Sequence, residues 1–154
     1  LPICRLVLRR MAQLDLDGER NQAIWLGLAE QKRAPTLHVA LALAKLQRDA
    51  TDTVGELEAL APVLSRLSFD AATAPLAAIA ARRLVALEKK GDALLLWKKI
   101  LFSAGLPEAQ RVPFLREGIA AAKAAGEPDR AARWEEELQR LLPPPPPPKK
   151  PAKP

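Results

Sequence analysis

The sequence is short of the residues that build disulfides, metal sites and most catalytic centres. Cys4 is the only cysteine and His38 the only histidine of 154 residues. One cysteine cannot form an intramolecular disulfide, and a metal site needs three or four ligands. Cys4 stands in an apolar stretch beside Ile3 and Leu6, which favours a buried filler over half of a Cys–His nucleophile pair. We therefore expect no metal and no cofactor.

Other signatures of chemistry and location are missing as well. There is no glycine-rich phosphate loop and no nucleophile elbow, so the sequence predicts neither an enzyme nor a small-molecule substrate. The sequence contains no run of about 18 apolar residues, the length that a membrane-spanning helix needs. It also shows no secretory signal at its start, so both cytoplasm and periplasm stay open as locations. Because Leu1 is not a methionine, we expect an excised piece of a longer protein or a processed form.

Aromatic residues are scarce, with three Phe, three Trp and no Tyr. The apolar residues are instead dominated by Ala and Leu, which lose little conformational freedom in a helix, whereas strands favour β-branched and aromatic residues. This composition predicts an all-α protein. Its length suits one ordinary domain. The Ala-, Leu-, Arg- and Pro-rich usage is typical of a bacterial protein from a GC-rich genome.

The net charge of +6 points at first to a nucleic-acid or membrane partner. Three of the basic residues, however, lie among the last twelve: Lys149, Lys150 and Lys153. Without them, residues 1–142 carry 21 basic and 18 acidic side chains, a net charge of +3 that is ordinary for a soluble domain. A basic field over the whole domain is not expected, which disfavours nucleic acid as the partner.

Four glycines are each followed at once by an acidic residue, at separations of 37, 36 and 35 residues. The pairs are Gly18-Glu19, Gly55-Glu56, Gly91-Asp92 and Gly126-Glu127. A glycine just past a helix accepts the left-handed conformation that ends it. An acid in the first turn of the next helix meets unpaired N–H groups and the positive end of the helix dipole. The pairs thus predict four tight turns between antiparallel helices.

Amphipathic stripes flank each pair and predict eight helices. The expected helices span residues 3–16, 19–32, 36–49, 56–67, 73–90, 92–104, 112–125 and 128–142. Between hairpins the sequence places breakers at Ala34-Pro35, 68–73 and 105–107. Pro62 interrupts the fourth range and suggests a later start near Ala61, whereas Pro113 fits an early position of the seventh helix.

A helix hairpin of about 34 residues with Gly-acid at its turn resembles the tetratricopeptide repeat. In that family a small residue follows the turn glycine by five positions; Ala23 and Ala131 match this, while Leu60 and Leu96 depart from it. The resemblance implies an α-α superhelix, or solenoid, of about four hairpins over residues 1–142. It also implies a protein–protein interaction scaffold in a larger assembly, which binds a partner peptide or helix on the concave face lined by the first helices.

Five basic residues fall near the positions that face the groove in this family when the chain is aligned on its turn glycines. They are Arg5, Arg9, Lys45, Arg82 and Arg116. Their shared sign predicts a groove that accepts an acidic or carboxylate-bearing segment through charge-assisted hydrogen bonds. The alternative is that they are solvated side chains on amphipathic helices.

Trp25, Trp97 and Trp134 recur six to eight residues after their glycines, each on a second helix of a hairpin. Tryptophan is enriched at interfaces, so a recognition surface is one reading. Their place on second helices favours packing between stacked hairpins, and we expect them to be buried.

Residues 143–154 comprise eight prolines, three lysines and one alanine. The six successive prolines end the last helix at Leu142 and predict an extended polyproline tail outside the folded domain. The tail is either a stiff linker or a ligand for a proline-recognising groove, with Lys149 and Lys150 supplying the flanking charge.

Two other functions stay open. Pentatricopeptide arrays share a period near 35 and read single-stranded RNA, but the corresponding places here hold unrelated and often apolar residues. An accessory or regulatory domain of a larger enzyme is the other alternative.

Overall fold

The computed structural model describes residues 17–103 and 105–144, with side chains from Gln22 onward. Within these residues the chain forms seven α-helices and no strand, which confirms the all-α prediction. The helices are α2 (Asp17–Arg33), α3 (Leu37–Asp49), α4 (Thr53–Ser65), α5 (Ala74–Ala86), α6 (Lys90–Phe102), α7 (Glu108–Ala124) and α8 (Pro128–Leu141). The expected helix 3–16, with Cys4, and most of the tail lie outside the described residues.

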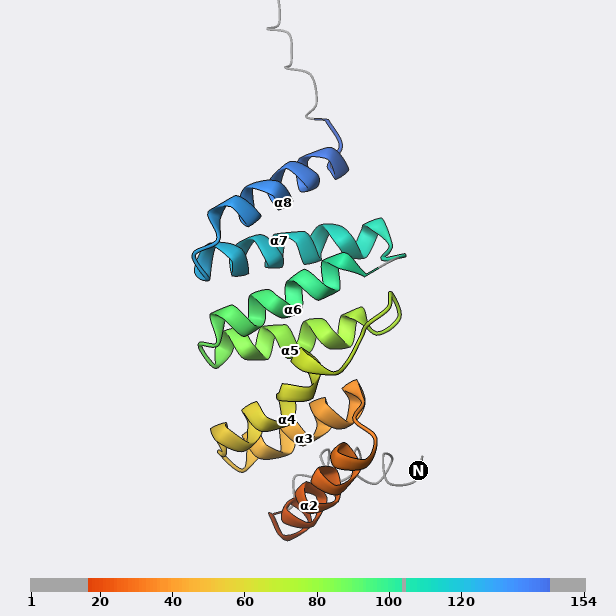
Figure 1. Ribbon diagram of the computed structural model, residues 1–154, viewed down its shortest axis with the longest axis vertical. Coiled ribbons are helices and arrows are strands. Elements are labelled where there is room, and N and C mark those ends of the chain that lie inside the picture. Colours follow the sequence, from red (N-terminus) through yellow and green to blue (C-terminus); the bar gives the residue numbers. More distant parts are fainter. Residues whose placement is uncertain (1–16, 104, 145–154) are drawn as a thin grey trace, which may run out of the picture.

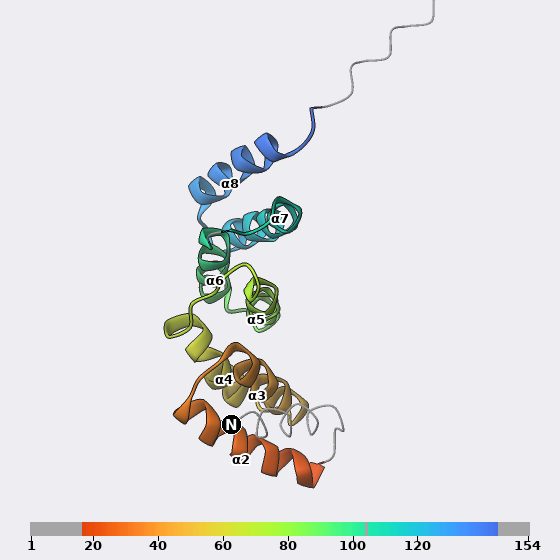
Figure 2. The same ribbon diagram turned by 90° about the vertical axis from the view of Figure 1, so that its right-hand side faces the viewer.

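The helices follow one another in chain order along the long axis of the molecule, α2 at one end and α8 at the other (Figure 1). Turned by 90°, the molecule shows α5 and α7 on one side of the stack and α6 and α8 on the other (Figure 2). The chain thus alternates between two layers as it climbs. The first helices of successive hairpins, α5 and α7, come to lie on the same side.

Three of the connections are the same three-residue turn. Its middle residue is left-handed in every case: Thr51 with φ 58°, Glu88 with φ 59° and Gly126 with φ 77°. In each turn this residue donates its N–H to the carbonyl three residues back, and the next residue donates to the carbonyl five back, at 2.9 to 3.2 Å. These bonds are the Schellman motif, which satisfies the last carbonyls of the first helix. The motif closes three hairpins: α3–α4, α5–α6 and α7–α8.

The glycine prediction is correct at Gly126 and wrong at Gly55 and Gly91. Gly126 is the left-handed residue before α8. Gly55 and Gly91 instead lie inside α4 and α6, because these helices begin three and two residues earlier than expected. Gly18 lies in α2, and the residues before Asp17 are outside the described ranges. The acids fare better, since Glu56 and Asp92 do stand in first turns. The left-handed residues of these two turns are Thr51 and Glu88. Neither threonine nor glutamate favours a left-handed conformation, so the sequence does not predict it at these positions.

Gly55 has a different reason to be glycine. Asp52 caps α4, and its Oδ1 accepts the Gly55 N–H at 2.9 Å. A Cβ on Gly55 would lie 2.6 Å from Asp52 Oδ2 and 2.7 Å from Gln47 Cδ, so a side chain there would force these two side chains to shift. The cap also fixes the start of α4 at Thr53. Pro62 then falls in the last turn of α4, and the expected start near Ala61 is wrong.

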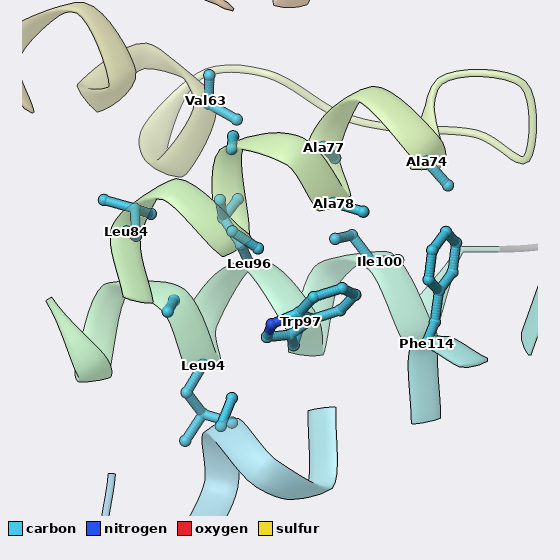
Figure 3. Packing of buried hydrophobic residues seen from close by; sticks show 14 of the residues in the cluster. Val63, Ala74, Ala77, Ala78, Leu84, Leu94, Leu96, Trp97, Ile100 and Phe114 are labelled. Carbon is cyan, nitrogen blue, oxygen red and sulfur yellow. The ribbon is translucent and has the colours of Figure 1, made fainter. Parts of the chain in front are cut away.

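The core runs through the stack as layers of small and large side chains. The buried face of α5 is built mostly from alanines, against which α6 places Leu96, Trp97 and Ile100 (Figure 3). The ring of Trp97 lies 5.7 Å from that of Phe114, which links α6 to α7. Trp134 packs where Gly118 has no side chain, since a Cβ there would lie 3.2 Å from the indole.

The expectation that all three tryptophans are buried holds for two of them. Trp97 is 1% and Trp134 7% exposed, whereas Trp25 on α2 is 69% exposed, which contradicts the prediction. The exposed side chain of Trp25 therefore takes no part in packing between the helices.

An ion pair joins the α3–α4 hairpin to the α5–α6 hairpin. Glu56 on α4 is 2% exposed, and Arg83 on α5 donates from Nη2 to its Oε2 at 3.0 Å and from Nε to its Oε1. The hydrogen bond from Arg83 to this carboxylate raises the pKa of the guanidinium, against the opposing effect of burial. The corresponding positions of the other two hairpins hold Ala93 and Ala131. A charged pair therefore replaces alanine packing at this junction.

Gly91, inside α6, and Gly126, in a turn, should respond oppositely to alanine. At Gly91 a Cβ meets nothing within 4 Å and φ is not positive, so Gly91→Ala should stabilise α6 by about 0.5 kcal/mol. Gly126→Ala should cost about 1 kcal/mol, because its φ of 77° strains any side chain. Urea unfolding of the two variants measures both signs. A loss of stability in Gly91→Ala would show that this glycine is a turn residue after all.

Substitution of Arg83, with its neighbour Arg82 as the control, tests the role of the buried ion pair with Glu56. Arg83→Leu leaves Glu56 charged, buried and unpaired, and should cost about 3 kcal/mol. Arg82→Leu removes a half-exposed ion pair on the same helix and should cost under about 1 kcal/mol. Chemical unfolding compares them. Equal losses would contradict the role assigned to the buried pair.

Candidate partner-binding groove

A recess of about 460 Å³ opens between α5, α6 and α7. Its volume lies within the range of about 300–1,000 Å³ that is usual for ligand sites. The lining residues are Arg82, Val85, Glu88, Lys90, Ala93, Trp97, Glu117, Ala120, Ala121 and Ala124. We call it the α5–α7 groove. It exists because the same turn sends α5 and α7 to the same layer, with α6 behind them.

Apolar side chains make up six of the ten lining residues of the α5–α7 groove, and five of the six are small. Ala93, Trp97 and Ala121 are buried at its base. Ala120 and Ala124, one helical turn apart, are exposed on α7, and Val85 on α5 is 47% exposed. These exposed residues continue the apolar surface of the base up to solvent. The groove therefore presents apolar surface to solvent.

An ion pair joins the two walls of the groove at the rim. Arg82 on α5 donates from Nη2 to Glu117 Oε1 on α7 at 2.9 Å and from Nε to Oε2 at 3.0 Å. The two side chains are 52% and 37% exposed. Glu88 and Lys90 add a second, longer contact of 3.8 Å between well-exposed side chains. The rim thus carries both signs of charge over an apolar base.

The basic residues expected to face a groove do not gather at one place. Arg5 and Arg9 lie outside the described residues. Lys45 and Arg82 are equivalent, each six residues before the left-handed residue of its turn, and each is paired with a carboxylate; Lys45 Nζ lies 2.6 Å from Asp49 Oδ2. Arg116 lines another recess of about 850 Å³, formed by α7 and α8. Of the three described, only Arg82 lines the α5–α7 groove.

Val85, Ala120 and Ala124 were missed by the sequence reasoning. Each stands outside the buried stripe of its helix, which is a weak signal for a valine and none for an alanine. Glu117 was missed too, since its partner Arg82 is 35 residues away in sequence. Only the stacking of α7 on the preceding hairpin brings these side chains together.

The groove offers binding surface rather than reactive groups. Its lining holds no hydroxyl, thiol or imidazole. Across residues 17–103 and 105–144, no group of three or more His, Cys, Asp and Glu side chains is arranged to hold a metal ion. Over the same ranges, no helix combines the length and apolar character needed to cross a membrane.

Comparison with known proteins identifies no relative of this chain. No family model matches the chain, and no match to it is found among curated proteins or solved structures. The tetratricopeptide resemblance therefore stays a prediction, and the groove has to be interpreted from the chain's own residues.

The ion pair at the groove rim should couple its two residues only weakly. A double-mutant cycle of Arg82→Ala and Glu117→Ala is expected to give a coupling free energy of about 0.5 kcal/mol at low salt, because both side chains are partly hydrated. The coupling should shrink towards zero in 1 M salt, where the Debye length is about 3 Å. A coupling several times larger that salt leaves unchanged would mean that the pair is desolvated.

Proposed function

We propose that this chain is a tetratricopeptide-like helical-repeat scaffold that binds a segment of a partner protein in the α5–α7 groove. The observation that carries the proposal is the groove itself, an apolar recess between two helices of one layer that stays open to solvent. The recurrence of one turn at residues 51, 88 and 126 supports the repeat, since its spacing of 37 and 38 residues matches a stacked helix-hairpin unit.

The partner that fits this groove is recognised mainly by apolar contact. Small side chains at the base and along α7 leave room for the larger apolar side chains of a bound helix or peptide. The rim residues Arg82 and Glu117 already pair with each other, so a strongly acidic segment gains little from them. Ion pairs at a rim tune the register and rate of binding more than its affinity. Such a module would serve as an adaptor within a larger assembly.

Crosslinking from the groove, followed by blocking it with a large side chain, tests the proposal. A photo-crosslinking amino acid at Ala120 of the full chain should capture a partner from an extract of the source organism, and the same group at exposed Leu95 on α6 should not. With the captured partner purified, Ala120→Arg should raise the dissociation constant about tenfold or more, because it blocks the centre of the contact.

Ala109→Arg is the matched control. Ala109 is exposed on the same helix, about three turns before Ala120, and does not line the groove. Both variants should keep the wild-type melting temperature, since both residues reach solvent. Equal affinity of the two variants for the captured partner would refute the groove as its binding site.

A further inference from the structure

The second surface that stands out lies at the other end of the stack, between α2 and α4. A groove of about 260 Å³ runs along the C-terminal halves of these two helices. Its lining residues are Leu28, Gln31, Lys32, Glu58, Ala61, Pro62, Ser65 and Arg66. Gln31 donates from Nε2 to the Ala59 carbonyl at 2.7 Å, and this bond holds α2 against α4 beside the groove. We call it the α2–α4 groove.

Large apolar side chains are exposed along α2, in the groove and one turn before it. Leu28, which lines the groove, is 46% exposed, and Trp25, one turn earlier on the same helix and outside the lining, is 69% exposed. Ala61 across the groove is exposed as well. Because Trp25 lies largely in solvent, packing within the stack gives no reason for a tryptophan at this place.

Two basic residues and one acidic residue line the α2–α4 groove: Lys32, Arg66 and Glu58. Lys32 and Arg66 lie at the C-terminal ends of α2 and α4, and Glu58 lies eight residues before Arg66, or about 12 Å along the helix. All three side chains are exposed, and none makes an ion pair or side-chain hydrogen bond with another described residue. The groove thus has two unpaired cations and one unpaired anion.

We propose that the α2–α4 groove is a docking site for an amphipathic helix of a partner protein that carries carboxylates at one end. Apolar side chains of the helix cover Trp25, Leu28 and Ala61, and its carboxylates meet Lys32 and Arg66. Trp25 lies seven residues before Lys32, about 10.5 Å along α2. Two turns of a bound helix span this distance, so apolar and acidic residues seven positions apart on the partner match the groove.

This site differs in place and in chemistry from the α5–α7 groove. There the basic residue on the rim is paired with a carboxylate, whereas here both cations are free for a ligand. The sequence predicts an acidic partner segment on the concave side. The cations that are free to bind such a segment, Lys32 and Arg66, instead lie at the C-terminal ends of α2 and α4. The inference does not rest on the proposed function, because neither groove shares a lining residue with the other.

Trp25 supplies the readout for a binding experiment. It is the exposed tryptophan, while Trp97 and Trp134 are buried, so covering Trp25 should shift the emission of the full chain to shorter wavelength. The probe is an 18-residue Ala-rich helical peptide with three leucines along one face and two glutamates in its first turn, also labelled for anisotropy. We expect saturable binding with a blue shift that Trp25→Phe abolishes.

Charge reversal tests the assigned chemistry. The double variant Lys32→Glu, Arg66→Glu should bind the peptide about tenfold more weakly at low salt. The matched double variant Arg116→Glu, Arg133→Glu makes the same change of net charge on exposed residues far from this groove and should bind as wild type does. Ala120→Arg should also leave peptide binding unchanged, which separates this site from the α5–α7 groove.

Four results would overturn the inference. They are no saturable peptide binding, equal weakening by the two charge-reversal variants, a self-association seen by sedimentation that Trp25→Phe removes, and a blue shift produced by vesicles of anionic phosphatidylserine but not by the peptide. The third result would assign the surface to a second copy of the chain, and the fourth to a membrane.

Discussion

The structure depends on a single turn made three times. Each turn needs one residue in the left-handed conformation, so that two N–H groups of the turn can reach back to the last carbonyls of the first helix. Threonine and glutamate adopt that conformation at a cost of about 1–2 kcal/mol relative to a right-handed geometry, and glycine adopts it freely. The chain accepts this strain at Thr51 and Glu88 because the turn sets how the two helices of each hairpin meet.

From this turn follow both the core and the grooves. It places α5 and α7 in one layer, with Trp97 of α6 behind them against Phe114. Alanines on α5 and α7 let the helices approach and leave the α5–α7 groove where side chains are too small to fill the space. Where the first hairpin meets the second, the buried pair of Glu56 and Arg83 replaces alanine packing. A buried pair of this kind adds little net stability but penalises any arrangement that separates the charges.

Much of the fold could be predicted from the sequence, because it is written in local patterns. Apolar periodicity and Ala–Leu composition gave the described helices to within about four residues at either end, and Pro128 marked the start of α8 correctly. The turns were misplaced by three or four residues at Thr51 and Glu88, since a left-handed threonine or glutamate leaves no signature in a sequence. The glycines nearby were a misleading guide: Gly55 is there for close contact with Asp52 and Gln47.

The candidate sites could be predicted less well, because they depend on which helices share a layer. Arg82 was placed near a groove, but its carboxylate partner on α7 was not foreseen. Trp25 was assigned to packing by its likeness to Trp97 and Trp134, whereas it lies exposed on α2. Which residues are buried depends on the neighbouring hairpins, and the apolar pattern of one helix does not show which helices will pack against it.

The central claim is that the stacked hairpins bind a partner segment through the α5–α7 groove. Amide chemical-shift mapping by NMR, with the captured partner titrated into the full chain, tests it most directly. The account predicts that the largest shifts fall on Val85, Ala93, Ala120, Ala121 and Ala124, with the helical pattern of the other amides unchanged. Shifts confined to α3, α4 and the outer face of α8 would contradict it.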